Sequence, residues 1–569
     1  MVLKVLLAYR CSHEGASNPF ERILPVGVGY VHSYLRSRGV PTVLANVSGM
    51  DRGRIREILL AENPDVVGIS CFTFNRSASL ELARLVKSTL PGARVVLGGP
   101  HATHAGASIL GAHPEVDVCV SGEGEITLDR LVRTLGEQGE ASAIPGLFLR
   151  GAAGDVVSTG AAVPIADLDA LPFPALYADG YGVDPRAQYP YIVTSRGCPA
   201  ECTFCSSPEF WGSRVRFRSA ANILDELELL KRRFGLLYVS FRDDVFALHR
   251  TRVLDLCRGM VERRLGLLWD CQTRVAAIDE ERLTWMKRAG AMIVQYGIES
   301  GSQPVLDRLR KGQTLAQVDA AAATTRRVGL VLSIYLITGV PGEGEDDLAA
   351  TEAMVRRIRP HDGIVTPLAV FPGTSLWEEY RAARGLDDGI WEGVGRDGVY
   401  VRPEPFTEDA ILRLSSLLES EGPSNQYTHA DFGAHRALVG DCHATDLMEA
   451  ELCEREEDAA GAERLYADLA AREPWNPWPR LHLGRMALAG ADPAGAEAHL
   501  TAALALVPES SDARGLLEQC RSGSAPRRKG KTPVPAPAGA RPSGARRGAR
   551  GFQSYPPPPR PLDGGDRPS

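Results

Sequence analysis

The sequence contains no apolar run long enough to cross a lipid bilayer, and this absence excludes a large class of proteins. A membrane-spanning helix needs about 20 consecutive apolar residues. Although 44% of the 569 residues are hydrophobic, no run approaches that length. The apolar start, residues 1–9, is too short for a signal peptide with its cleavage site and predicts a buried first strand. We therefore expect a cytoplasmic protein without a membrane partner.

An excess of positive charge and a regular spacing of cysteines are also missing. The formal net charge is -7, which disfavours a general nucleic-acid binder. The 11 cysteines are irregularly spaced, and cytosolic thiols stay reduced, so a disulfide framework is not expected. The length instead predicts three or four domains of about 150 residues each.

The first part of the chain, residues 1–160, alternates short apolar runs with helical periodicity. This is the pattern of a doubly wound, Rossmann-like parallel α/β domain. The predicted strands are residues 4–9, 42–45, 66–70, 94–98 and 116–120. A linker over residues 161–186 should follow, because Pro172 and Pro174 can continue neither a helix nor a strand.

The same alternation resumes over residues 187–400 and predicts a partial (β/α)6 TIM barrel. Its six expected strands are residues 191–195, 238–242, 267–271, 293–298, 333–337 and 363–369. Active sites of such barrels lie at the carboxyl ends of the strands. We therefore look for function in the segments that follow each strand.

A connecting region, residues 401–445, leads to a helical module at residues 446–520 that contains an internal repeat. The segment Gly-Ala-Glu at residues 461–463 recurs at residues 495–497, an offset of 34 residues. This period is typical of tetratricopeptide repeats (TPR), which bind protein partners, although a plain helical bundle is the alternative. Two such units rarely stand alone, so we expect them to pack on the barrel.

The last segment, residues 521–569, is rich in proline, glycine and arginine and predicts a disordered basic tail. Its arginines could contact nucleic acid or an acidic partner, and its prolines could bind a proline-binding groove. A solvated tail without a partner is the simpler interpretation.

Three cysteines are clustered directly after the first predicted barrel strand, at Cys198, Cys202 and Cys205. The spacing C-x3-C-x2-C lets three thiolates bind three irons of one cubane and leaves the fourth iron open. A zinc site would need a fourth ligand, and the nearby His249 falls in a different strand–helix unit. The pattern therefore predicts a [4Fe-4S] cluster.

With Phe204 directly before the last cysteine, this motif resembles the signature of the radical S-adenosylmethionine (SAM) superfamily. The resemblance implies that SAM chelates the open iron and that one electron from the cluster cleaves SAM to a 5′-deoxyadenosyl radical. It also implies an electron donor of the flavodoxin or ferredoxin type.

Polar or glycine-rich segments at later strand ends resemble further elements of the same superfamily. Together with Phe204, the residues for which the resemblance implies SAM contacts are Asp243, Asp244, Glu299 and Gly339. Residues of these types at strand ends also form turns and helix caps, which is the alternative for each. Cys271 could be a further ligand, but a buried free thiol is the favoured interpretation.

Three loops of small residues follow strands of the N-terminal domain and open at its carboxyl edge, where doubly wound folds bind extended cofactors. With residues 25–30, they are similar to the cobalamin-binding domain that precedes many radical SAM barrels. The resemblance covers residues 1–400. It implies cobalamin contacts for Ser70, Thr73, Gly98, Gly99 and Glu123.

The D-x-H-x-x-G motif, with which some cobalamin domains supply a histidine to cobalt, is absent around His13. We therefore expect no protein histidine below the cobalt. His101 and His104 are expected to cap helices or to bind backbone groups.

The resemblance implies a cobalamin-dependent radical SAM enzyme that methylates an unactivated carbon of a small-molecule substrate; some relatives rearrange or cyclise instead. A methylthiotransferase remains an alternative, with a second cluster on Cys11, Cys71 and Cys119, although no small β-barrel RNA-binding domain follows. An inactive TPR scaffold is the alternative of another class. None of these residues identifies the substrate.

Overall fold

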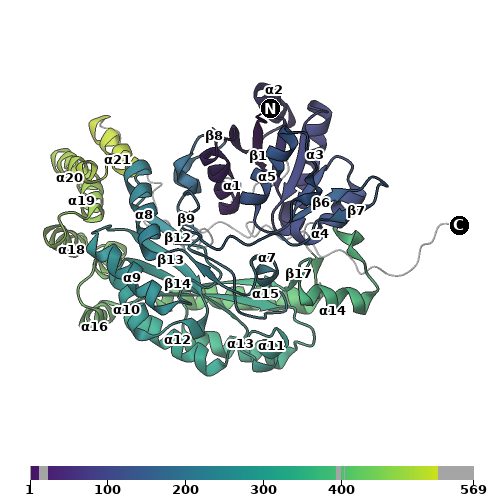
Figure 1. Ribbon diagram of the computed structural model, residues 1–569. Helices are drawn as coiled ribbons and strands as arrows, with labels where there is room; N and C mark the ends of the chain where they lie inside the picture. The colour runs from purple at the N-terminus through teal and green to yellow at the C-terminus, as the bar shows by residue number, and fades with distance from the viewer. Residues whose placement is uncertain (1, 12–22, 393–398, 403, 523–569) are drawn as a thin grey trace.

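The computed structural model describes residues 2–11, 23–392, 399–402 and 404–522. Figure 1 shows an N-terminal α/β domain above a strand–helix barrel, with a group of helices at the left of the barrel. The predicted tail, residues 521–569, lies outside the described residues apart from its first two positions. No helix within the described ranges has both the length and the apolar character needed to cross a membrane.

The N-terminal domain is built on a sheet with the strand order β7-β6-β5-β4-β3-β1-β2-β8. The strands are β1 (Val5–Tyr9), β2 (Thr42–Asn46), β3 (Val66–Ser70), β4 (Arg94–Gly98), β5 (Val118–Val120), β6 (Leu147–Arg150), β7 (Val156–Ser158) and β8 (Gly180–Tyr181). The helices are α1 (Val26–Ser37), α2 (Arg52–Glu62), α3 (Arg76–Thr89), α4 (Pro100–Ala112) and α5 (Gly124–Gly136). The first five strands run parallel, which confirms the predicted fold class.

Strand β1 explains why this sheet is buried on both faces. Leu6 and Ala8 belong to one apolar cluster, while Val5, Leu7 and Tyr9 belong to another on the opposite face. Side chains alternate between the faces of a strand, so a continuous apolar run is needed where helices cover both sides. The chain order reverses between β1 and β3, and ligands of doubly wound folds bind at such a switch point.

The predicted linker is not a simple spacer, because it contains β8, which pairs with β2 through Leu44 and Ala45. It also contains α6 (Pro185–Gln188). The hairpin of β6 and β7 pairs antiparallel beside β5 and was not predicted. The domain boundaries themselves remain a prediction.

The barrel contains the six predicted parallel strands in the order β16-β15-β14-β13-β12-β9. They are β9 (Tyr191–Ile192), β12 (Tyr238–Phe241), β13 (Leu268–Thr273), β14 (Ala291–Glu299), β15 (Val331–Thr338) and β16 (Asp362–Pro367). The outer helices are α8 (Ala220–Phe234), α9 (Arg250–Glu262), α10 (Glu280–Arg288), α12 (Leu315–Val328), α13 (Glu345–Ile358) and α15 (Pro405–Glu421). Shorter elements are α7 (Ser207–Trp211), α11 (Gln303–Arg308), α14 (Ser375–Arg384), β17 (Ala369–Val370) and β18 (Val399–Tyr400).

The first predicted barrel strand, residues 191–195, is interrupted. Beyond β9 the chain turns into β10 (Ser195–Arg196), which pairs antiparallel with β11 (Arg216–Phe217). The cause is the carboxylate of Asp243, which accepts hydrogen bonds from the backbone N–H of Thr194 at 2.5 Å and of Ser195 at 3.1 Å. These donors are then not available to a neighbouring strand.

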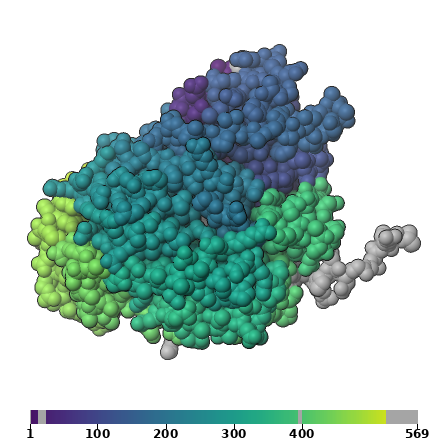
Figure 2. Space-filling view, turned by 60° about the horizontal axis from the view of Figure 1, so that its bottom comes forward, coloured from purple at the N-terminus to yellow at the C-terminus, as the bar shows by residue number. Residues whose placement is uncertain are grey.

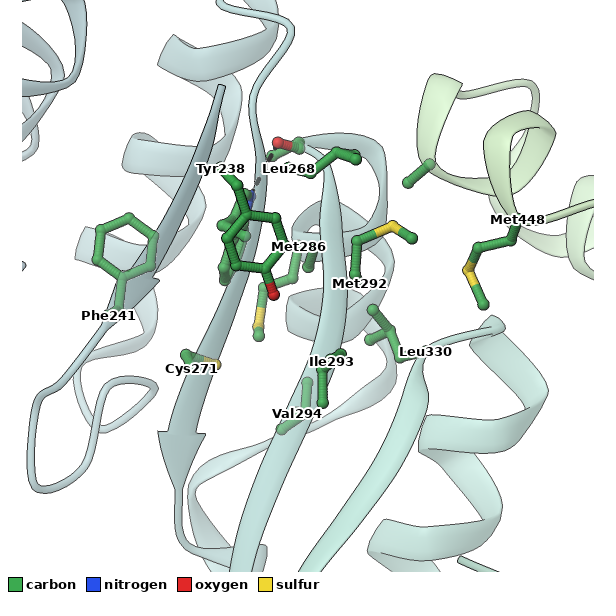
Figure 3. Packing of buried hydrophobic residues seen from close by; sticks show 14 of the residues in the cluster. Tyr238, Phe241, Leu268, Cys271, Met286, Met292, Ile293, Val294, Leu330 and Met448 are labelled. Carbon is green, nitrogen blue, oxygen red and sulfur yellow. Dashed lines mark hydrogen bonds between the residues drawn. The ribbon is translucent and has the colours of Figure 1, made fainter. Parts of the chain in front are cut away.

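The C-terminal helices pack against the amino ends of the barrel strands. They are α16 (His429–Val439), α17 (His443–Arg455), α18 (Ala459–Arg472), α19 (Pro477–Ala489), α20 (Pro493–Leu506) and α21 (Ser511–Ser522). Trp478 donates to the carbonyl of Gly266 at 3.0 Å, just before β13. Figure 3 shows Met448 of α17 beside Met292 and Leu330 of the barrel, in one apolar cluster. The predicted packing on the barrel is confirmed.

The 34-residue repeat corresponds to equivalent helix starts. Asp458 caps α18 through the N–H of Gly461, and Asp492 caps α20 through the N–H of Gly495. In Figure 2 these helices form the yellow-green edge of the molecule, away from the N-terminal domain.

Candidate functional site

A cavity of about 520 Å³ lies at the carboxyl edge of the N-terminal sheet and reaches the barrel. All five residues expected to contact cobalamin line it: Ser70, Thr73, Gly98, Gly99 and Glu123. The opposite wall comes from the segment after the last clustered cysteine and from the end of β12, and its residues are Ser206, Ser207, Phe210, Trp211 and Arg242. The structure thus places the two halves of the expected site in one cavity.

The walls of the cavity suit a large, mostly apolar ligand with a few polar groups. Glycines line part of the cavity without side chains: Gly27 and Gly124 lie in the first turns of α1 and α5, and Gly122 lies in the loop after β5. Gly99 has a further role, since its φ is +101° and an added Cβ would lie 2.7 Å from the carbonyl oxygen of Cys71. Only glycine allows this approach of α4 to the end of β3.

Glu123 makes its contacts within the protein. Its carboxylate accepts from Arg196 at 3.0 Å and from the N–H of Ile165 at 3.0 Å, and it also pairs with Arg216. Thr73 is likewise engaged, because its hydroxyl lies 3.1 Å from Nδ1 of His101. Contacts of these two side chains with a cofactor remain a prediction.

Arg196 joins the barrel to the N-terminal domain. Its guanidinium pairs with Glu123 and, at 2.6 Å, with Glu125, and it lies between the rings of Tyr30 and Trp211. Burial acts to lower the pKa of Arg196, but the two carboxylates outweigh it, so the pKa lies above its ordinary value. Arg196 therefore stays charged two residues before Cys198.

The segment that carries the three cysteines is fixed at several points. Gly197 has φ +109°, and a Cβ there would lie 2.9 Å from the carbonyl oxygen of Arg214. The N–H of Cys205 donates to the carbonyl of Cys202 at 3.2 Å, and Thr203 binds the carbonyl of Leu309 at 3.0 Å. The cysteines are thus held in a compact loop at the carboxyl end of the barrel.

The three thiols of this loop are fully or partly buried. All three are free, and Cys198 is buried. Burial raises the pKa of Cys198 and of Cys205, while nearby backbone N–H groups lower it, so metal binding would have to displace their protons. Arg274 directs Nη1 to the sulfur of Cys202 at 3.5 Å, a contact that favours negative charge on sulfur.

In the part of the chain that the structure describes, no three His, Cys, Asp or Glu side chains converge as ligands of one metal ion do. Ligands of a cubane bind separate irons and stand further apart. His249, considered above for zinc, caps α9, accepting from the N–H of Arg252 at 3.2 Å.

Asp243 and Asp244, both expected to contact SAM, have different surroundings in the structure. Asp243 is only 1% exposed and binds Thr194 and Ser195, so its structural role is clear. Asp244 lies beside the cysteine loop, accepting from the hydroxyl of Ser207 at 2.8 Å, and desolvation raises its pKa to about 6. A contact of either carboxylate with SAM remains a prediction.

Glu299 and Phe204 are connected through Lys311, a residue that the sequence did not single out. Lys311 pairs with Glu299 at 2.6 Å, and its Nζ lies 5.9 Å from the centre of the Phe204 ring. Gly339 has φ +82° and donates to Glu343 at 2.7 Å. Glu343 also accepts from Val340, so it shapes the turn after β15.

The cysteines that were considered for a second cluster or as further ligands lie outside the cavity. Cys71 and Cys119 are buried in one apolar cluster and Cys11 in another, and none lines the cavity. This favours cobalamin over a second cluster. Cys271 is fully buried in the barrel core, as a free thiol would be.

The two histidines considered for cobalt do not line the cavity either. Burial, with help from Arg76 and His104, lowers the pKa of His101 to about 3. The pKa of His104 is lowered by burial alone.

Comparison with known proteins agrees with this arrangement. Residues 18–132 match the B12 binding domain family, residues 192–355 the radical SAM superfamily and residues 455–520 a tetratricopeptide repeat family. An uncharacterized methyltransferase of Pyrococcus horikoshii is 31% identical over 68% of this chain and 85% of its own length. The anaerobic magnesium-protoporphyrin IX monomethyl ester cyclase of Rubrivivax gelatinosus is 29% identical over 66% of this chain and 70% of its own length.

Among solved structures, the radical SAM methyltransferase TsrM from Kitasatospora setae, with cobalamin and a [4Fe-4S] cluster bound, superposes with a TM-score of 0.57 at 19% identity. The match covers 67% of this chain and 75% of TsrM and shows a shared fold. With the two domains in this order and a relative at 31% identity, the chain belongs to the cobalamin-binding branch of the radical SAM superfamily.

Proposed function

We propose that this protein is a cobalamin-dependent radical SAM methyltransferase that acts on an unactivated carbon of a small molecule. One observation supports this most directly: the 520 Å³ cavity is lined by the three small-residue loops of the B12 binding domain and by residues that directly follow Cys205. A group bound there would lie next to a group bound by the cysteines.

The proposed cofactor contacts follow from this placement. Cys198, Cys202 and Cys205 would hold a [4Fe-4S] cluster, and the loops after β3, β4 and β5 would hold cobalamin. When bound, the cluster with SAM supplies hydrogen-atom abstraction, and cobalamin supplies the methyl group. The chain's own residues position these groups and exclude water.

Three features of the protein serve that task. Arg196 ties the cysteine loop to the cobalamin domain through Glu123 and Glu125. Arg274 places positive charge at Cys202, and Phe210 and Trp211 contribute apolar surface to the cavity wall opposite the loops of the N-terminal domain. Such a wall keeps solvent from reactive intermediates.

Cyclisation or rearrangement is the second candidate, supported by the similarity to the Rubrivivax gelatinosus cyclase, of which the chain covers 70%. The two activities differ in their products. A methylated product gains the labelled methyl group of SAM, whereas a cyclised one does not.

The test uses protein reconstituted anaerobically with iron, sulfide and hydroxocobalamin. We expect about four irons and one cobalamin per chain, and transfer of a deuterated methyl group from labelled SAM to a small molecule of the source organism's extract. A variant with the three clustered cysteines changed to alanine is the control and should retain cobalamin but not iron. Two clusters without cobalamin would instead indicate a methylthiotransferase, and neither metal would indicate a scaffold.

Three expectations about partners and location stay predictions. They are an electron donor of the flavodoxin or ferredoxin type, a protein partner for the tetratricopeptide-like helices, and a location in the cytoplasm.

A further inference from the structure

Arg242 stands where the cavity meets the inside of the barrel. It directly follows β12 and lines the cavity wall that faces the N-terminal domain. Its Nη1 donates to Oε1 of Gln295 on β14 at 3.4 Å. The neighbour of Gln295, Val294, belongs to the core cluster beneath the outer helices, so Gln295 points to the inside of the barrel.

The charge of Arg242 is not balanced by an acid in the cavity wall. The other charged residues in the lining are Glu123 and Glu125, and both pair with Arg196. Deeper in the barrel, the carboxylate of Asp270 accepts from Tyr238 at 2.9 Å and from Ser240 at 2.6 Å. Within the described residues, Arg242 forms no ion pair and its hydrogen-bond and ring partners are neutral. Burial raises the pKa of the Asp270 carboxyl, and Arg242 is close enough to act against this larger effect and lower it.

The remaining surroundings of Arg242 are polar but uncharged. Gln272 donates to Gln295 at 3.2 Å and to the hydroxyl of Tyr335 at 3.1 Å, and Tyr335 donates to Gln295 at 2.9 Å. The ring of Tyr191 lies 5.3 Å from the guanidinium carbon. The ring covers one face of the guanidinium, whereas its N–H groups point outward from the edge.

A guanidinium edge of this kind is suited to oxyanions. Its five N–H donors form a planar fork that matches a carboxylate or a phosphate, and one of them is used weakly by Gln295. In a mostly apolar cavity, the attraction between such a fork and an anion is stronger than in water.

We propose that Arg242 binds a carboxylate or phosphate group of the substrate, with Gln272, Gln295 and Tyr335 as hydrogen-bonding neighbours. The proposal rests on the proposed function, because it places the anionic end of the substrate between the cobalamin cavity and the barrel interior. The substrate class is therefore an organic acid or phosphate ester.

The experiment measures the binding of radiolabelled inorganic phosphate and acetate to the reconstituted holoenzyme by equilibrium dialysis. We expect the wild-type protein to bind at least one of these anions. Arg242→Gln should weaken that binding by about tenfold or more, and Arg242→Lys should retain part of it, because lysine keeps the charge but not the fork. Arg250→Gln is the matched control: its side chain is 51% exposed and lines a different cavity. It should leave anion binding unchanged.

A second variant guards against a folding defect. Gln295→Glu keeps Arg242 and places a carboxylate within reach of it, so it should abolish anion binding as well. Anion binding that is absent from the wild-type holoenzyme, or unchanged in both variants, would overturn the proposal.

Cobalamin and SAM carry anionic groups of their own. The same variants show whether Arg242 binds one of these groups instead of a substrate anion. Loss of cobalamin content or of SAM affinity in Arg242→Gln would assign the arginine to a cofactor and also overturn the proposal. A wild-type protein that holds no cobalamin contradicts the proposed function, whereas a loaded protein without Arg242-dependent anion binding contradicts this inference alone.

Discussion

Arg196 donates through Nη2 to Oε1 of Glu125 at 2.6 Å, and this buried ion pair connects the start of the cysteine loop with helix α5 of the N-terminal domain. Both side chains are 3% exposed. The cobalamin cavity and the cysteine loop are therefore positioned by one and the same contact. A substitution of Arg196 or of Glu125 should affect both the cavity and the cysteine loop.

Replacing Arg196 with methionine should unfold the protein more easily and release cobalamin. The change leaves the buried Glu125 without its ion-pair partner, while Glu123 keeps Arg216. An unpaired buried charge costs about 3–5 kcal/mol in comparable sites. Urea denaturation with cobalamin absorbance measures both effects. Arg133→Met is the control, because Arg133 is 45% exposed in its pair with Asp129, and it should change stability little. Equal effects of the two variants would show that Arg196 has no special role.

Asp243→Asn should lower stability rather than affinity for SAM. The amide oxygen can still accept from the N–H groups of Thr194 and Ser195, but without a charge, and the NH2 group can no longer accept from the hydroxyl of Thr194. Arg252 also loses its carboxylate, 3.8 Å away. The expected cost is about 1–3 kcal/mol, with lower iron incorporation. Asp244→Asn is the comparison and should keep the stability. A loss of SAM affinity at unchanged stability in Asp243→Asn would support the cofactor role suggested by its motif.

Gly99→Ala should destabilise the N-terminal domain, since a Cβ at this position meets the carbonyl oxygen of Cys71 at 2.7 Å and φ is +101°. Strain of this kind costs on the order of 1–3 kcal/mol. Gly111→Ala is the matched control in the same helix, where nothing lies within 4 Å of the added carbon. It should leave stability equal or slightly higher, by up to about 1 kcal/mol. Thermal unfolding curves of the two variants compare them directly.

The buried His101 should make the protein less stable in mild acid. Burial lowers its folded pKa from 6.5 to about 3, so the unfolded chain binds a proton that the folded chain does not bind between these values. The free energy of unfolding should therefore fall as the pH drops below 6.5, by about 1.4 kcal/mol per pH unit. His101→Asn, which keeps a hydrogen-bonding group for Thr73, should reduce that slope in denaturation curves between pH 6.5 and 5.

His429 provides a control of opposite sign. Its pKa is raised by Glu449 and Glu456, so it stabilises the folded state at low pH and loses this effect as the pH rises through its folded pKa. His429→Asn should leave the acid-induced loss as steep or steeper. A slope that is identical in the wild type and both variants would contradict the assignment.

Arg274→Gln should lower the reduction potential of the proposed cluster. An N–H group directed at a cysteine sulfur stabilises the reduced, more negative state, and removing it shifts the potential on the order of tens of millivolts. A redox titration followed by electron paramagnetic resonance measures the shift. Arg282→Gln is the control. Arg282 and Arg274 both line a second cavity, which is separate from the one at the N-terminal domain, but Arg282 binds Asp279 and the carbonyl of Ala247 instead of a cysteine.

The strands that carry the site could be predicted because they are apolar runs that are buried on both faces, as in β1 and β14. The residues that line the cavity followed from their position directly after such strands. Both inferences use only neighbours in the sequence. They do not depend on how distant parts of the chain meet.

The features that the sequence did not reveal all depend on distant contacts. Asp243 and Thr194 are 49 residues apart, and an aspartate at a strand end is equally suited to bind a ligand or the backbone. Arg196 and Glu125 lie in different domains, 71 residues apart. The hairpin β6–β7 was missed because Arg150, Val157 and Ser158 do not form an apolar run, and they are largely exposed at the edge of the sheet.

The helical module lies at the end of the barrel opposite the cavity, where Trp478 and His443 bind the carbonyls that precede β13. A protein held by the outer surfaces of these helices would therefore approach from the side away from the reacting carbon. It could stay attached through successive turnovers while small molecules come and go at the other end. Recruitment to a larger assembly and exchange of substrate would then be independent events, governed by separate surfaces of one polypeptide.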